Sequence, residues 1–159
     1  MRKSNFLLSF IVLTVTLLWS QSELTTSEYQ QLIETAGRFT DGTNYSIIVA
    51  KKIPVVKFHN KNKEINYFVQ SNDFSQIKGY NGITNLALVF NLSKQLVSVQ
   101  IIKSEDTRSY IRKIINAGFL GSFIGKSEFK IIKPVSGATI SSKAIICTIE
   151  EICAQIEFD

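Results

Sequence analysis

The stretch ITNLALVFNLSKQLVSVQII, residues 83–102, decides the fold class that we expect for this chain. It holds two apolar runs, residues 83–90 and 96–102, which are separated by the mostly polar residues 91–95. Two apolar runs of strand length joined by a short polar segment are typical of a β-hairpin, whose strands pair antiparallel. Residues 83–102 therefore predict one hairpin of an antiparallel sheet.

Further strands are expected on both sides of this hairpin. Residues 44–52 form an apolar run of strand character. Residues 53–58 and 65–69 flank a polar segment, which predicts an earlier hairpin. Residues 129–132 are expected to form a short strand that ends before Pro134, because proline cannot occupy a central strand.

Three helices complete the expected fold. The first covers residues 27–36 and ends at Gly37, and the second covers residues 107–118. The last is capped by Thr139 or Ser141. It carries an apolar stripe at helical spacing, formed by Ile145, Ile149, Ile152 and Ile156. This order of elements predicts a single α+β domain with a mainly antiparallel sheet and flanking helices.

The composition is that of a globular protein, since 45% of the 159 residues are hydrophobic and 19% are charged. The formal charge is +5, and it falls to +3 if Arg2 and Lys3 are removed with an export signal. The remaining lysines are scattered, whereas a nucleic-acid-binding domain gathers its basic residues on one face. We therefore expect no nucleic-acid partner.

The first 22 residues have the pattern of a signal peptide. Arg2 and Lys3 precede an apolar run over residues 6–19, and small residues precede a cleavage site after Ser22. The run is shorter than the ~20 residues that cross a bilayer, which favours cleavage over anchoring. We expect residues 23–159 to form the exported domain, in the periplasm or on the outer face of the cytoplasmic membrane.

The sequence predicts no metal centre. It has one histidine, His59, and no Cys-x-x-Cys pair, so ligand sets for haem, iron–sulfur clusters and zinc are missing. We expect His59 to be exposed in a polar turn. Cys147 and Cys153 lie six positions apart in the last helix, a rise of ~9 Å that places them beyond disulfide reach. Both are expected to be small buried residues, and any redox chemistry then needs an organic cofactor.

The turn VSGATISS, residues 135–142, has the residues of an anion site. It joins a strand-like segment to a helix, and Gly137 allows a positive φ and a close backbone approach. Free N–H groups at a helix N-terminus favour a phosphate, and the hydroxyls of Ser136, Thr139 and Ser141 are additional donors. A capped helix after a tight turn explains the same residues without a ligand.

Three motifs in order resemble the FMN-binding domain family. They are KGYNG at residues 78–82, SEDT at residues 104–107 and SGAT at residues 136–139. That family includes the flavin-bearing G subunit of the Rnf complex and the C subunit of the sodium-pumping NADH:quinone reductase. The resemblance covers about residues 53–152, most of the expected mature chain.

The resemblance implies that FMN is the cofactor and that its phosphate is joined to Thr139. A flavin transferase makes that phosphoester in the family, with FAD as the flavin donor. By the same resemblance, the phosphate turn consists of Ser136, Gly137 and Ala138. A noncovalent FMN site is the alternative, because Lys133 replaces an acidic residue of the family motif.

Two further loops are implied to face the flavin. Asp106 and Thr107 follow the second hairpin, and Gly79, Tyr80 and Gly82 precede it. A helix cap at Asp106–Thr107 and two plain turn glycines are the alternatives that the residues alone leave open. This chain also departs from the family at Arg108 and Ser109, where a Pro-Gly pair is usual.

The aromatic residues near these loops have two interpretations. Tyr80, Phe119 and Phe123 could pack on an isoalloxazine ring. Phe119 and Phe123 lie four positions apart, which favours a place in the core instead.

The function that this sequence predicts is electron transfer by an exported flavin carrier, because no acid–base pair marks a separate substrate site. Its partners are then a flavin transferase and redox proteins, which could be membrane-bound. An exported module that binds FMN noncovalently or not at all is the alternative, and a small flavin reductase is a third hypothesis.

Overall fold

The computed structural model describes residues 26–50, 53–129 and 131–157. The chain divides into two compact units, residues 1–31 and 32–159. Of the first unit only residues 26–31 are described, and they form the start of helix α2 (Thr26–Phe39). The signal peptide predicted at residues 1–22 lies outside the described residues.

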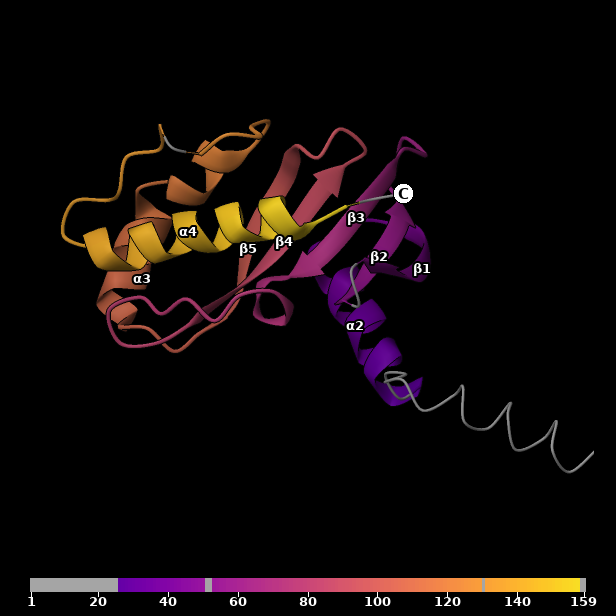
Figure 1. The fold of residues 1–159 in the computed structure, drawn as a ribbon, viewed down its shortest axis with the longest axis horizontal. Helices are drawn as coiled ribbons and strands as arrows, with labels where there is room; N and C mark the ends of the chain where they lie inside the picture. Colours follow the sequence, from indigo (N-terminus) through magenta and orange to yellow (C-terminus); the bar gives the residue numbers. More distant parts are fainter. Residues whose placement is uncertain (1–25, 51–52, 130, 158–159) are drawn as a thin grey trace, which may run out of the picture. The chain divides into compact units, whose positions relative to one another are not determined.

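The second unit is built on an antiparallel sheet of five strands (Figure 1). The strands neighbour one another in the order of the sequence: β1 (Thr43–Ala50), β2 (Ile53–His59), β3 (Ile65–Gln70), β4 (Thr84–Asn91) and β5 (Leu96–Ser104). Helices α3 (Arg108–Asn116) and α4 (Thr139–Gln155) follow the sheet. The predicted α+β class with an antiparallel sheet is confirmed, and the predicted hairpin at residues 83–102 is the β4–β5 pair.

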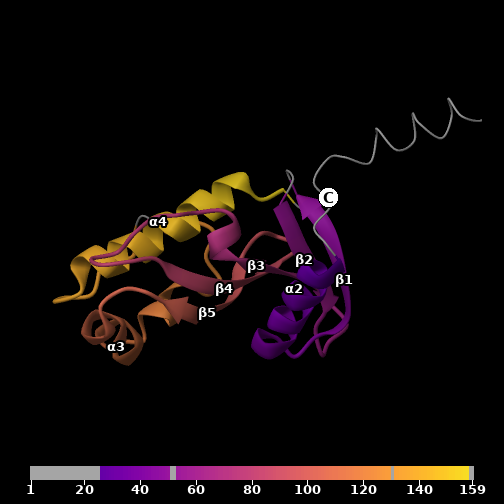
Figure 2. The ribbon, with the colours of Figure 1, turned by 90° about the horizontal axis from the view of Figure 1, so that it is seen from below.

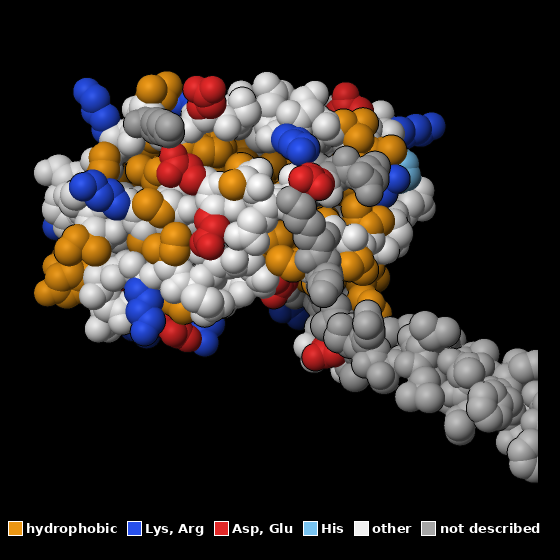
Figure 3. All heavy atoms as spheres, viewed as in Figure 1, with side chains coloured by type: hydrophobic (Ala, Val, Ile, Leu, Met, Phe, Trp, Pro, Cys, Tyr) orange, Lys and Arg blue, Asp and Glu red, His pale blue; other side chains and the backbone are white. Residues whose placement is uncertain are grey.

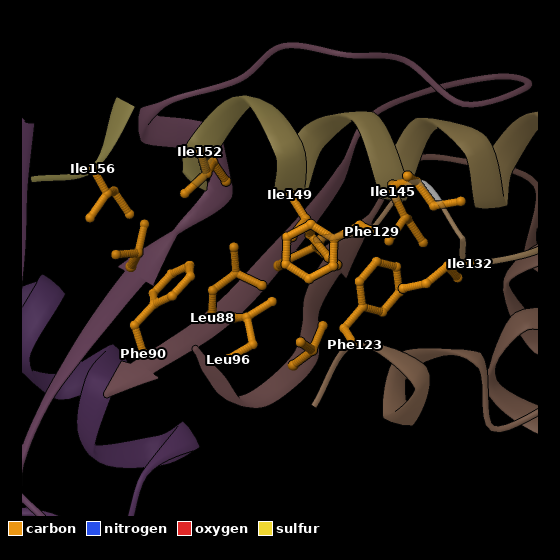
Figure 4. Packing of buried hydrophobic residues seen from close by; sticks show 14 of the residues in the cluster. Leu88, Phe90, Leu96, Phe123, Phe129, Ile132, Ile145, Ile149, Ile152 and Ile156 are labelled. Atoms are coloured by element: carbon orange, nitrogen blue, oxygen red, sulfur yellow. The ribbon is translucent and has the colours of Figure 1, made fainter. Parts of the chain in front are cut away.

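One face of the sheet packs against α4. The predicted isoleucine stripe of this helix faces the strands, and Figure 4 shows Ile149 and Ile152 directed toward Leu88 and Leu96. Ile149 and Ile152 are fully buried. Because burying an isoleucine side chain stabilises a fold by about 1.5–3 kcal/mol, this stripe stabilises the packing of α4 on the sheet.

The opposite face of the sheet is also covered. Leu32 and Ala36 of α2 belong to a second buried cluster with Phe68, Ala87 and Val89. Neighbouring residues of a strand point to opposite faces, so β4 contributes to both clusters. This explains why residues 86–90 are apolar at every position instead of at alternate positions.

Several elements differ from the prediction. Helix α2 continues through Gly37 and ends at Phe39, where the Thr40 hydroxyl donates to the carbonyl of Ala36 at 2.9 Å. The predicted strand at residues 129–132 is wrong: Ile132 N–H donates to Phe129 O at 2.9 Å, which is a turn, and both side chains are buried. Apolar residues three apart fit a turn on the core surface as well as they fit a strand.

Two short 3₁₀ helices, η1 (Ser71–Asp73) and η2 (Phe119–Phe123), were not predicted. In η2, Phe119 and Phe123 pack edge to face with ring centres 5.2 Å apart, and both are buried. The prediction that these two aromatic residues belong to the core is therefore confirmed.

Two predictions of burial are corrected. His59 is half-buried at the end of β2, where it pairs with Thr43 and Ile65, and its buried Nδ1 has no hydrogen-bond partner among the described residues. Cys147 is exposed, because it lies off the isoleucine stripe of α4, and Cys153 is half-buried. Both cysteines are free.

Thiol labelling should distinguish the two cysteines. Burial, with a smaller contribution from Glu150, raises the pKa of the Cys153 thiol from 9.0 to about 11. Its thiolate fraction at pH 8 is then about 100-fold lower than that of an ordinary thiol. We expect Cys147 to react at least about tenfold faster than Cys153 with a maleimide, as followed by mass spectrometry. A Cys147→Ser control should show only the slow reaction, and equal rates in the wild type would contradict this arrangement.

In the described part of the chain, no helix is both long and apolar enough to cross a membrane. Charged side chains of both signs are interspersed with apolar ones on the face that carries α4 (Figure 3). The same face exposes apolar side chains at the end where α4 begins. The loop between η1 and β4 extends to this end of the second unit, beside α3 and the start of α4 (Figures 1 and 2).

Candidate functional site

Asp106 connects two of the three predicted motifs. Its carboxylate accepts hydrogen bonds from the backbone N–H groups of Tyr80 (3.2 Å), Asn81 (2.9 Å) and Thr107 (2.7 Å). The side chain is only 6% exposed. A buried carboxylate that accepts several N–H groups holds its loops firmly, because leaving those groups unpaired costs free energy. Asp106 thereby positions the loop that carries Tyr80.

The two predicted glycines of that loop allow this close approach. A Cβ atom at Gly79 would overlap the Asp106 carboxylate, and one at Gly82 would lie 2.7 Å from the backbone oxygen of Glu105. Gly79 N–H donates to Gly82 O at 2.9 Å, which closes a tight turn. Both positions therefore need glycine for space, because a backbone or a carboxylate lies where a side chain would start.

The hydrogen bonds to Asp106 also change its acidity. Burial alone raises the pKa of this carboxyl, but the nearby Ser141 hydroxyl and the N–H groups of Thr107, Asn81 and Tyr80 outweigh it. The pKa of Asp106 is therefore held below its ordinary value of 3.8. The buried Ser141 Oγ lies near this carboxylate but outside strict hydrogen-bonding geometry, and it has no other partner among the described residues.

The third motif forms a tight turn that leads into α4. Ala138 N–H donates to Val135 O at 3.0 Å, and Gly137 has a φ of +70°, which glycine adopts without strain. The helix begins at Thr139, and Ala138 occupies the N-cap position without a side-chain cap. The predicted cap by Thr139 or Ser141 is therefore wrong.

Ser142 ties the turn to the first turn of the helix. Its hydroxyl accepts from Val135 N–H at 3.0 Å and donates to Ala138 O at 2.8 Å. The first intrahelical bond runs from Ser142 N–H to Ala138 O. The N–H groups of residues 139–141 consequently have no acceptor within the helix, and an anion at this position could accept from them.

A hollow of about 250 Å³ opens in front of these N–H groups. The Tyr80 and Tyr110 rings lie on one side of it, packed edge to face with centres 5.1 Å apart. Residues 137–141 form the rest of its lining, including the exposed Thr139 and the buried Ser141. Tyr80 and Ile140 remain 60% and 55% exposed at its rim. The hollow thus combines a polar end at the start of α4 with an apolar, open rim.

One cation reaches the turn from another element. The Lys113 ammonium, on α3, donates to the carbonyl of Gly137 at 3.2 Å and lies 5.9 Å from the centre of the Tyr110 ring. Neither Lys113 nor Tyr110 is among the predicted site residues, although their spacing in the sequence is a signal for both. Tyr110 and Lys113 lie three positions apart in the helix after Asp106, so they share one helical face.

Not every predicted residue lines this hollow. Ser136 and Lys133 lie along a separate hollow of about 450 Å³ that also contains Phe119 and Ile132. Thr107 takes part through its backbone N–H, at the N-cap of α3. The structure therefore brings Tyr80, Gly137, Ala138 and Thr139 together along one hollow. Asp106 holds the Tyr80 loop through hydrogen bonds but lines a different hollow.

Comparison with known proteins agrees with this arrangement. Residues 79–153 match the family model of the FMN-binding domain. The match begins at the glycine that packs against Asp106 and includes the whole turn before α4, so it confirms the resemblance of the three motifs. A search of curated proteins found no match.

Proposed function

Because residues 79–153 match the family model of the FMN-binding domain, we propose that the chain is an exported electron-transfer protein that carries FMN at the turn before α4. The observation that carries this proposal is the polar end of the 250 Å³ hollow. There the unpaired N–H groups of residues 139–141 and the buried, unpartnered Ser141 Oγ are suited to a phosphate. The residues present therefore fit the group that the family implies.

We further propose that Thr139 is the covalent attachment site. Its side chain is exposed at the helix start, where a transferase can reach it. With FAD as donor, a bond forms between Thr139 Oγ1 and the flavin phosphorus while the bond from that phosphorus to the adenylate oxygen breaks. AMP leaves, and the hydroxyl proton passes to a base of the transferase. The free N–H groups of α4 stabilise the phosphate charge that remains.

The size of the hollow supports an exposed flavin ring. Ligand pockets usually measure roughly 300–1,000 Å³, so a hollow of about 250 Å³ holds only part of FMN. The polar end suits the phosphate, and the rim at Tyr80 and Ile140 suits the apolar ring. Bound FMN supplies one- and two-electron transfer. An exposed ring edge is accessible to redox partner proteins, which we propose as electron donor and acceptor.

The location proposed for this chemistry is the periplasm or the outer face of the cytoplasmic membrane. Its support is the basic start and short apolar run within residues 1–22. A flavin transferase in the same compartment is the partner needed for maturation.

Co-expression of the full chain with a flavin transferase in an exporting host tests the proposal. We expect yellow protein whose flavin fluorescence survives a denaturing gel and whose intact mass includes one FMN. Cells without the transferase should give a dark band and serve as control. A dark band in both cases together with binding of free FMN would establish the noncovalent alternative. A chain that neither binds nor gains flavin would refute the proposed function.

A further inference from the structure

We infer that Lys113 is the cation that holds the flavin phosphate at the start of α4, an inference that rests on the proposed function. Its ammonium already lies over the turn, since it donates to Gly137 O at 3.2 Å. A Cβ atom at Gly137 would come within 2.8 Å of the same nitrogen. Gly137 therefore leaves room for a positive charge beside the free N–H groups of α4.

The position of Lys113 on α3 directs it to this site. Tyr110 lies one turn earlier on the same helical face and lines the hollow, and the ammonium lies 5.9 Å from its ring centre. A lysine stem is flexible and the side chain is exposed, so the ammonium can move from the Gly137 carbonyl onto a phosphate oxygen. A charge-assisted bond to phosphate is stronger than its present bond to a neutral carbonyl.

The Lys113 ammonium offsets a negative charge that lies near the turn. The Asp106 carboxylate packs against Gly79, and the Cβ position of that glycine is also 3.3 Å from Ser141 Cα. A phosphate at the start of α4 therefore meets a like charge nearby, and Lys113 supplies the opposite charge.

Three other cations of this region line different hollows. Arg108 and Arg112 of the same helix line a different hollow, together with Asp106 and Ile111. Lys133 lines the hollow that contains Ser136. Arg112 is therefore a matched control for Lys113: it is the adjacent residue of the same helix, exposed and basic, but it lines a different hollow.

Titration of the unloaded full chain with FMN and with riboflavin, which lacks the phosphate, tests the inference. We expect the wild type to bind FMN more tightly than riboflavin. Lys113→Gln should weaken FMN binding about tenfold and leave riboflavin binding within about twofold. Lys113→Arg should restore most of the FMN affinity, and Arg112→Gln should change neither ligand.

Three results would overturn the role of Lys113. They are an equal loss of both flavins in Lys113→Gln, an unchanged FMN affinity, and a wild type without preference for FMN. If the unloaded chain binds neither flavin but the transferase loads it, thermal unfolding of the loaded and unloaded proteins tests the role of Lys113. Loading must then raise the unfolding temperature of Lys113→Gln much less than that of the wild type. If loading raises both unfolding temperatures equally, the role of Lys113 is rejected and the proposed function is not. A wild type that neither binds nor is loaded rejects the proposed function, and the role of Lys113 with it.

Discussion

Thr139→Ala is expected to abolish covalent flavin while the fold persists. The substitution removes Oγ1, the atom that would form the phosphoester, and alanine is the best helix former at a position that starts α4. Thr139 makes no side-chain cap, so no helix-stabilising hydrogen bond is lost. The exposed side chain also leaves no cavity behind.

In-gel flavin fluorescence after co-expression with a flavin transferase measures this effect. The band should fall to background in Thr139→Ala, with circular dichroism unchanged. Thr139→Ser keeps a hydroxyl at the same position and should retain part of the flavin. Ser136→Ala is a matched control: Ser136 lines the neighbouring hollow, so this variant should keep its flavin. Fluorescence that persists in Thr139→Ala would show that another residue carries the flavin.

Lys133→Asp tests whether the lysine at this position limits covalent loading of the flavin. It restores the acidic residue that the family motif has at this position, so we expect a higher fraction of loaded chains from the same co-expression. Lys133 is exposed, so the fold should tolerate either charge. A decrease in loading would instead indicate that the lysine itself assists attachment.

Asp106→Asn is expected to lower the free energy of unfolding by about 2–3 kcal/mol and to loosen the Tyr80 loop. Oδ1 accepts from the N–H groups of Asn81 and Thr107, and Oδ2 accepts from that of Tyr80. An amide replaces one of these oxygens with an NH₂ group, so at least one backbone N–H then faces a donor. Urea unfolding measures the loss. Glu105→Gln is the control: this neighbouring acid is 63% exposed and its ion pair with Lys103 contributes little.

The destabilisation caused by Asp106→Asn should decrease as the pH falls. The folded-state pKa of Asp106 lies below its ordinary value of 3.8, so the ionised carboxylate stabilises the fold fully above that value. The stabilisation is lost as the pH falls through the lower, folded-state pKa. The difference between wild type and Asp106→Asn should therefore be constant near neutral pH and narrow below about pH 4. A difference that grows on acidification would contradict the assignment of this charge.

The sequence by itself determined the sheet and the terminal helix. Apolar runs bounded by polar turns located both hairpins, and the stripe from Ile145 to Ile156 located α4, because hydrophobic periodicity is a local property of the chain. The same rule failed at residues 129–132, where Phe129 and Ile132 reach the core from a turn. It also failed at Cys147, since a helix that packs on one side leaves its other side exposed.

The three motifs of the site were also readable from the sequence, but only the tertiary structure decided how they combine. Asp106 bonds to backbone groups 25 and 26 residues earlier, and Lys113 bonds to a carbonyl 24 residues later. Such contacts depend on the pairing of β4 with β5 and on where α3 and α4 pack. The same packing placed Ser136 along the neighbouring hollow and Ser141 along the hollow that Thr139 lines, although the two serines are only five positions apart in the sequence. Composition and periodicity act along the chain, whereas a phosphate site is made by groups that converge in space.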